Sequence, residues 1–194
     1  RNYIGGRYSV LSEVGMIPAY FMGLKINYFR KNLQNIFKFK EKNLLTDNVI
    51  KLAHIYRYKK INSIILLNYA PEINEFLYWC QQLMAESLGK NGKGILPVVS
   101  PAPKDHHSLL QLYLDGPKDK LFCIFSLKLN KKMKINNNVF GKAFSFTANK
   151  ELSKVKEAQK NALIKALRNK KIPYREFRIS KIAEETLGEL FSYF

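Results

Sequence analysis

Short, nearly continuous apolar runs constrain the fold of this chain more than any other feature. Residues 63–69 (SIILLNY) and 121–127 (LFCIFSL) show no apolar/polar alternation, which is typical of strands buried on both faces. Two further strands are predicted at 95–99 and 174–179, and segments with helical periodicity separate the four. Strands that alternate with helices predict an α/β protein, with three layers (α/β/α) around a mainly parallel sheet.

The helical segments are predicted from the spacing of their apolar residues. Scaffold helices are expected at 27–39 and 46–59, and another begins near Ile73 and ends at the glycine-rich turn 89–94. Near the start of the chain, Ser9 or Ser12 is a plausible helix cap, and Pro18 should begin or kink an apolar helix. Asp105 is expected to cap a helix that carries His107 and Gln111 on one face, because the two lie four positions apart.

Size and hydrophobicity allow one substantial core, or one domain with an appendage. The chain has 194 residues, 46% of them hydrophobic. No apolar run approaches the roughly 18 residues needed to cross a bilayer, so no membrane partner is expected. The chain begins without Met, and its last predicted helix ends on Phe194. We therefore expect a fragment that lacks material at both ends, with Leu190, Phe191 and Phe194 exposed and prone to aggregation.

The two cysteines lie within apolar patterns, Cys80 in a helical one and Cys123 in a strand-like one. Two such thiols in a chain of this size indicate buried, reduced cysteines rather than a disulfide framework. We therefore expect a cytoplasmic protein.

The strongly basic composition raises the question of nucleic-acid binding. The chain has 33 Lys and Arg against 15 Asp and Glu, a formal net charge of +18. Much of this charge falls on the helix predicted at 150–171, where we expect a solvated face, with these residues turned inward: Leu152, Val155, Ala162, Leu163, Ala166 and Leu167. A nucleic-acid-binding surface would interleave exposed aromatics with Lys, whereas the aromatics here mostly follow core periodicities. No nucleic-acid partner is expected, and a positive field would also help to recruit a small anionic substrate.

Several residues could carry chemistry, although each has a plainer explanation. Glu86 shares a helix face with Gln82, four positions earlier, and could be a general base or a solvated surface acid. Arg7 follows two glycines that would let a ligand approach the backbone closely, yet it could simply pair with a surface acid. His107 could be a histidine bonded to the backbone. His106 and His107 point in different directions on a helix, and no further ligands complete a metal site, so no metal is expected.

Three segments, taken together, resemble one enzyme family. Residues 2–15 (NYIGGRYSVLSEVG) are similar to the GGR[FY]S signature of glucose-6-phosphate isomerases, with Glu13 in place of a usual small residue. The segment QQLMAES…GK at 81–90 resembles the family's QQ…ES.GK segment, and residues 104–117 (KDHHSLLQLYLDGP) resemble the bacterial form of its histidine segment. The three occur in the family's order and cover essentially the whole chain, more loosely after Asn130. The resemblance implies a sugar-isomerase (SIS) domain, a flavodoxin-like, doubly wound form of the three-layer fold.

The resemblance also assigns roles to residues. Glu86 matches the catalytic base that moves a proton between C1 and C2 of a hexose 6-phosphate, and Arg7 matches the arginine that stabilises the enediolate. His107 matches the ring-opening histidine, while Gln82 and Gly6 match residues lining the substrate site. In this family the histidine is contributed to the neighbouring subunit, which implies a homodimer. The implied reaction is the interconversion of glucose 6-phosphate and fructose 6-phosphate in glycolysis and gluconeogenesis, with neither metal nor organic cofactor.

The resemblance predicts an incomplete enzyme. Residues 1–130 would form the core of the second SIS domain and 131–194 its truncated C-terminal part. The first SIS domain, which holds the substrate phosphate, and the C-terminal tail with its site lysine have no counterpart here, so the chain alone is expected to be inactive. A non-catalytic sugar-phosphate sensor of the same fold remains the alternative, although a sensor would have no need for the carboxylate of Glu86. A basic nucleic-acid-binding protein is a third, weaker alternative.

Overall fold

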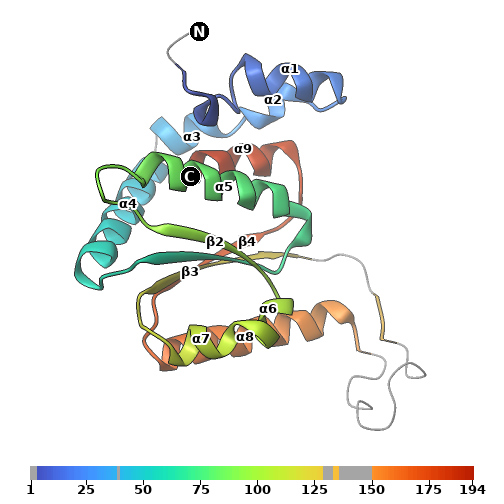
Figure 1. The fold of residues 1–194 in the computed structure, drawn as a ribbon. Helices are drawn as coiled ribbons and strands as arrows, with labels where there is room; N and C mark the ends of the chain where they lie inside the picture. Colours follow the sequence, from blue (N-terminus) through green and yellow to red (C-terminus); the bar gives the residue numbers. More distant parts are fainter. Residues whose placement is uncertain (1–3, 39, 129–132, 136–149) are drawn as a thin grey trace.

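A four-stranded parallel sheet forms the centre of the molecule (Figure 1). The computed structural model describes residues 4–38, 40–128, 133–135 and 150–194. The strand order is β2-β1-β3-β4, with bounds β1 Ser63–Asn68, β2 Leu96–Pro101, β3 Lys120–Leu127 and β4 Tyr174–Ile179. Helices cover both faces of the sheet, which confirms the predicted three-layer α/β class. The domain boundary expected at residue 130 lies outside the described residues.

The central strands are buried on both faces, as their apolar runs predicted. Alternate residues of β1 enter different cores. Ile64 and Leu66 belong to the cluster on one side of the sheet, while Ile65 and Leu67 belong to the cluster on the other side. Each buried side chain of this size stabilises the fold by about 1.5–3 kcal/mol relative to exposure, so a strand with apolar residues on both faces is held at the centre of the sheet.

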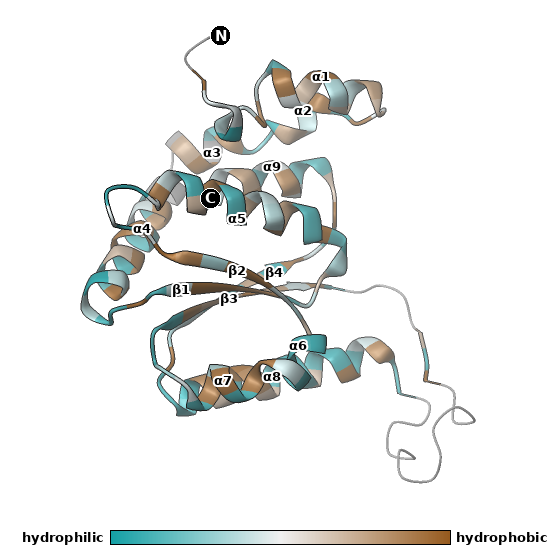
Figure 2. Ribbon diagram, viewed as in Figure 1, coloured by the Kyte–Doolittle hydropathy of each residue, from teal (hydrophilic) through white to brown (hydrophobic). Residues whose placement is uncertain are grey.

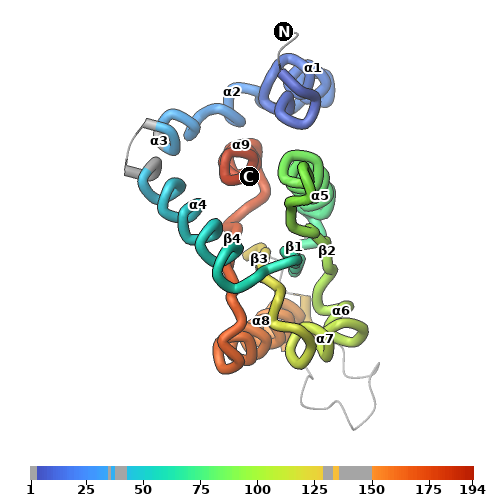
Figure 3. Tube along the Cα trace, turned by 60° about the vertical axis from the view of Figure 1, so that its left-hand side comes forward, coloured from blue at the N-terminus to red at the C-terminus, as the bar shows by residue number. Residues whose placement is uncertain are grey.

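One face of the sheet is covered by three helices, α4 (Lys40–Tyr58), α5 (Asn74–Leu88) and α9 (Glu184–Tyr193). Figure 3 shows α5 and α9 side by side on this face. An aromatic cluster joins them, because the ring of Phe191 lies 4.9 Å from Trp79 and 5.5 Å from Phe76, measured between centroids. This face also carries the N-terminal part of the chain.

The opposite face is covered by α6 (Lys104–Ser108), α7 (Leu110–Asp115) and α8 (Leu152–Asn169). Their buried residues Tyr113, Leu163 and Leu167 pack against Phe122 and Ile124 of β3. Figure 2 shows strands β1 and β2 made mainly of hydrophobic residues, while the helices combine hydrophobic and hydrophilic ones.

The N-terminal part consists of short helices above α5 and α9 (Figure 1). They are the 3₁₀ helix η1 (Gly6–Tyr8), α1 (Glu13–Phe21), α2 (Ile26–Phe29) and α3 (Leu33–Lys38); a second 3₁₀ helix, η2 (Pro71–Ile73), precedes α5. The Ser12 side chain accepts a hydrogen bond from the Val14 amide and caps α1, so Ser12 rather than Ser9 has the predicted capping role. Pro18 lies inside α1.

Two helix predictions were wrong in detail. The single helix expected at 27–39 is divided into α2 and α3, with Arg30 to Asn32 between them. Asp105 is not a cap, because Pro103 occupies that position and Asp105 lies inside α6. There it accepts hydrogen bonds from Ser100 and Ser108. The helix is interrupted at Leu109. His107 and Gln111 therefore lie in two different short helices instead of on one face of a single helix.

The C-terminal helix α9 packs against the rest of the protein, whereas the sequence predicted that its apolar side chains would be exposed. Leu190 is 6% exposed, and the Phe194 ring lies 5.6 Å from Phe177 and 5.9 Å from Phe76. The side chains that would have made a cut helix prone to aggregation are therefore part of the core on this face of the sheet.

The inward face of α8 also differs from the prediction. Leu163 and Leu167 are buried as expected, but Leu152 is 48% exposed and Ala162 is exposed. Lys160, assigned from sequence to the solvated face, is instead 6% exposed. Its burial depends on an acidic partner in a different element, which helical periodicity does not reveal.

The two cysteines, Cys80 and Cys123, are free and buried, in agreement with the sequence. Burial raises the pKa of both thiols, that of Cys123 to about 12. In the part of the chain that the structure describes, no helix is both long and apolar enough to cross a membrane.

Candidate active site

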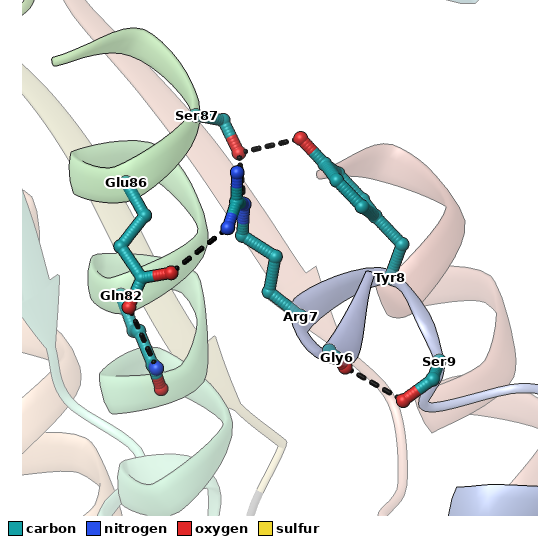
Figure 4. Close-up of polar contacts among 7 residues, drawn as sticks. All are labelled: Gly6, Arg7, Tyr8, Ser9, Gln82, Glu86 and Ser87. Carbon is teal, nitrogen blue, oxygen red and sulfur yellow. Dashed lines mark hydrogen bonds and ion pairs between the residues drawn. The ribbon is translucent and has the colours of Figure 1, made fainter. Parts of the chain in front are cut away.

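Arg7 of η1 reaches the C-terminal end of α5 and joins two segments that are far apart in the chain (Figure 4). Its Nη1 donates to Oε2 of Glu86 at 3.0 Å, across 79 positions of sequence. Its Nε donates to Oγ of Ser87 at 3.1 Å. The guanidinium group therefore uses its fixed fork of donors to hold two neighbouring side chains of α5 at once.

Both carboxylate oxygens of Glu86 are engaged. Oε1 accepts from Nε2 of Gln82 at 2.9 Å, one helical turn earlier, as the spacing of four positions allows. Oε2 accepts from Arg7. The Glu86 side chain is 47% exposed and that of Arg7 is 24% exposed, so the carboxylate is fixed in direction yet open to a molecule approaching from solvent.

The turn that carries Arg7 is built by its own backbone. The hydroxyl of Ser9 donates to the Gly6 carbonyl at 2.6 Å, and the Ser9 amide donates to the same oxygen at 3.1 Å. A Cβ placed on Gly6 would meet nothing within 4 Å. The surface beside Arg7 is therefore open at Gly6, where a ligand could lie directly against the backbone.

Two residues that sequence reasoning did not single out complete this cluster. The hydroxyls of Tyr8 and Ser87 lie 2.8 Å apart, and the Arg7 guanidinium carbon lies 5.1 Å from the centre of the Tyr8 ring, within range of a cation–π contact. Hydrogen bonding to Ser87, and then to Arg7, lowers the pKa of Tyr8. The signal for both residues in the sequence was their place within the two signature segments, Tyr8 in GGRYS and Ser87 after Glu86.

His107 is not part of this cluster. It lies in α6, on the face of the sheet opposite to α5, and is exposed (Figure 1). The structure therefore brings together Arg7, Glu86, Gln82 and Gly6, but it separates His107 from them by the thickness of the sheet. Within one copy of the chain, His107 and Glu86 cannot act on the same small molecule.

The neighbouring His106 has a structural partner. Its Nε2 lies 2.6 Å from the hydroxyl of Tyr69, at the end of β1. Burial lowers the pKa of His106, and the nearby carboxylate of Asp105 only partly opposes this effect. Among the residues that the structure describes, no group of three or more His, Cys, Asp or Glu side chains is arranged to hold a metal ion.

The arrangement is suited to proton transfer next to a developing negative charge. A carboxylate with an open side can accept a proton from carbon, and a guanidinium beside it can stabilise an oxyanion. Both groups are held in place by neighbours before any ligand binds.

Comparisons with known proteins find sequence relatives along nearly the whole chain. The glucose-6-phosphate isomerase of Methanocaldococcus jannaschii is 32% identical over 96% of this chain and 47% of its own length. The glucose-6-phosphate isomerase of Campylobacter jejuni is 30% identical over 98% of this chain and 48% of its own length. The chain thus spans about half the length of the curated relatives it matches. No protein-family model matches it.

A solved structure shares the fold. The crystal structure of a hypothetical protein from Thermus thermophilus superposes with a TM-score of 0.82, at 26% sequence identity, over 98% of this chain and 48% of that one. Along almost its whole length the chain is similar to glucose-6-phosphate isomerases, and it matches about half of each of these enzymes.

Proposed function

We propose that the protein containing this chain interconverts glucose 6-phosphate and fructose 6-phosphate through a cis-enediol intermediate, as an aldose–ketose isomerase. The observation that carries the proposal is the 3.0 Å contact between Arg7 and Glu86. It unites the two signature segments that would have to meet for this chemistry. The names of the relatives support the same reaction.

Glu86 is proposed as the base that takes the proton from one carbon of the open-chain sugar and returns it to the next. Its two oxygens are oriented by Gln82 and Arg7, so one oxygen can turn to the substrate while a neighbour holds the other. Arg7 would then face the negative charge that develops on the enediolate oxygen, where a preorganised cation lowers the barrier. Gln82 and the open backbone at Gly6 would line the sugar-binding surface.

His107 is proposed as the ring-opening acid/base group of a second copy of the chain. Histidine is suited to this role near neutral pH. The separation of His107 from Glu86 by the sheet supports the idea, because only a partner could bring such a histidine to the Arg7–Glu86 cluster. The active protein would therefore be a homodimer in which each site combines two chains.

The chain is proposed as the second SIS domain of a two-domain enzyme, with residues 1–130 as its core and 131–194 as its C-terminal part. The hexose 6-phosphate would bind between this domain and the rest of the protein, which would hold the phosphate. We accordingly expect the 194-residue chain alone to be inactive. The reaction as proposed uses neither a metal nor an organic cofactor. A cytoplasmic location is proposed from the two free, buried cysteines.

The proposal is tested by measuring the conversion of fructose 6-phosphate by the product of the full reading frame and by its Glu86→Gln variant. We expect kcat to fall by about three orders of magnitude or more, with the circular dichroism spectrum unchanged. Glu75→Gln is the matched control, since Glu75 is an exposed acid in the first turn of the same helix. It should retain normal activity.

Two results would contradict the proposal. A Glu86→Gln variant that works nearly as well as the unmodified enzyme would remove Glu86 from the reaction. A protein that binds the sugar phosphate without converting it would instead be a sensor of the same fold.

A further inference from the structure

A cavity with several charged side chains lies at the carboxyl edge of the sheet, away from the Arg7–Glu86 cluster. Its volume is about 500 Å³, within the range of small-molecule sites. It is bounded by the ends of β3 and β4, by Tyr69 after β1 and by the first turns of α8. In parallel α/β sheets, ligands bind preferentially outside the carboxyl ends of the strands. None of the candidate active-site residues lines this cavity.

The charged side chains that line this cavity are mostly cationic. Two carboxylates, Glu151 and Glu157, are outnumbered by five cations that come from β4, from α8 and from the end of β3: Lys128, Lys154, Lys156, Lys160 and Arg178. Arg178 and Lys160 share a third carboxylate, that of Glu176. Lys128, Lys154 and Lys156 form no ion pair with any described residue. They are available to an anion from outside.

Lys160 gives the cavity a fixed positive charge at its inner wall. Its side chain is 7% exposed, and Nζ lies 2.8 Å from Oε1 of Glu176 and 3.4 Å from Oγ of Ser126. A buried ammonium is retained only with a partner, and Glu176 holds this one in place. The ammonium group therefore has a defined position, unlike that of a freely rotating surface lysine.

Hydroxyl donors lie among these cations. Ser126 near the end of β3, Ser180 after β4 and Ser153 in the first turn of α8 all line the cavity. The positive end of the α8 dipole points to the same place, because the 18-residue helix begins there. Lysine ammonium groups and serine hydroxyls are the usual protein ligands of phosphate oxygens.

We propose that this cavity binds a phosphate dianion, either free phosphate or the phosphoryl group of a small phosphomonoester. The combination of an inner ammonium, three lysines that form no ion pair with a described residue, and the hydroxyls of Ser126 and Ser180 is matched by a group with a charge near −2 and several acceptor oxygens. The volume of about 500 Å³ leaves space for a small organic part beside the phosphoryl group. The site is independent of the proposed isomerase reaction, since it uses different residues.

The test is equilibrium dialysis of the full reading-frame protein against inorganic phosphate, with ionic strength held constant by chloride. The double variant Lys154→Gln/Lys156→Gln should bind one equivalent of phosphate fewer per chain at concentrations that saturate the unmodified protein. For the lost site, this corresponds to a decrease in affinity of roughly a hundredfold, or about 2.8 kcal/mol. Both lysines lie near the surface of α8, so folding should be preserved.

Two control variants show whether the phosphate that is no longer bound had occupied this cavity. Lys165→Gln removes an exposed lysine of the same helix that does not line the cavity, and it should bind as much phosphate as the unmodified protein. Arg7→Gln removes the cation of the candidate active site and should leave the cavity's equivalent intact. A double variant with unchanged stoichiometry, or an Arg7→Gln variant that loses the same equivalent, would overturn the proposal.

A second arm with methyl phosphate distinguishes the two sources of the phosphoryl group. Tighter binding of methyl phosphate than of inorganic phosphate, lost in the double variant, would assign the cavity to a phosphomonoester. Equal or weaker binding with the same loss would assign it to free phosphate. Isomerase activity is measured separately, so a failure of the proposed reaction does not affect this outcome.

Discussion

The phenolic oxygen of Tyr69 lies 2.6 Å from Nε2 of His106 and ties the end of β1 to helix α6. Tyr69 is 3% exposed, so most of its side chain is shielded from water. The contact also fixes the helix that carries His107, the residue proposed to act in a partner's site. A histidine without an assigned chemical role thus orients the helix of its neighbour.

Removal of the Tyr69 hydroxyl should destabilise the fold modestly. Tyr69→Phe keeps the ring but leaves the buried side of His106 without its partner, which should lower the free energy of unfolding by about 1 kcal/mol. Urea denaturation measures this change. Tyr78→Phe is the control, because Tyr78 is 51% exposed and should lose nothing measurable. Equal stability of Tyr69→Phe and the unmodified protein would show that the hydrogen bond contributes little.

His106 should make stability depend on pH in the weakly acidic range. Burial lowers its pKa below the ordinary value of 6.5, so the unfolded chain binds this proton more readily than the folded protein. The contribution of His106 to the free energy of unfolding should therefore be fully present above about pH 6.5. It should decrease as the pH falls towards the lower pKa that His106 has in the folded protein. His106→Gln should remove this component of the profile, whereas His54→Gln, at an exposed position in α4, should retain it.

Packing of the last helix should contribute strongly to stability. Phe191 contacts the rings of both Trp79 and Phe76, so Phe191→Ala should cost about 2–3 kcal/mol, somewhat less than for a fully buried phenylalanine. Thermal unfolding measures this cost. Phe21→Ala is the control, because Phe21 is 81% exposed, and it should leave the midpoint temperature of thermal unfolding unchanged. A stable Phe191→Ala variant would mean that α9 is dispensable for the core.

The Lys160–Glu176 pair should be sensitive to the loss of either charge. Glu176→Gln leaves a buried ammonium without a counter-ion and should cost about 3 kcal/mol. Asp115→Asn, which breaks an exposed pair with Lys170, should have little effect. If both variants behave alike, burial does not strengthen the Lys160–Glu176 interaction.

The same pair should affect acid stability. Burial raises the pKa of Glu176, but hydrogen bonds from Arg178 and Lys160 outweigh it, so the net pKa is below the ordinary 4.5. The resulting stabilisation is complete above about pH 4.5 and is lost as the pH falls through the lower folded value. Glu176→Gln should therefore be less stable at pH 7 and show a shallower loss of stability in acid.

A close helix crossing should make Gly188 intolerant of a side chain. A Cβ at this position would lie 1.9 Å from the carbonyl oxygen of Phe29, so Gly188→Ala must push α9 away from α2. We expect a loss of about 2–3 kcal/mol in urea unfolding. Gly6→Ala, where a Cβ meets nothing within 4 Å, should unfold like the unmodified protein. An unaffected Gly188→Ala variant would show that the two helices separate at little cost.

The strands could be predicted from sequence almost residue by residue. The strand expected at 174–179 occurs as Tyr174–Ile179, and that expected at 121–127 begins one residue earlier, at Lys120. The prediction succeeds because a strand covered on both faces needs apolar residues at consecutive positions, which is a local property of the chain. The strand expected at 95–99 is displaced to Leu96–Pro101, since the prolines within and after it obscured its end.

The helices and the candidate site were only partly predictable. Gln82 and Glu86 share a helix face by spacing alone, whereas Arg7 could be connected to Glu86 only through a family resemblance. The break at Leu109 and the division of the helix expected at 27–39 have no strong signal, because short helices are held by contacts with other elements rather than by their own propensity.

The sequence by itself determined the class of the fold, the positions of its strands and the resemblance to one enzyme family. Tertiary structure decided the rest. It placed Arg7 against Glu86, separated His107 from both, buried Phe191 and Phe194, and turned Lys160 inward towards Glu176. Apolar runs and motifs are local and can be read along the chain, whereas these contacts join residues far apart in sequence. Their free energies of burial and pairing exist only after the sheet has assembled.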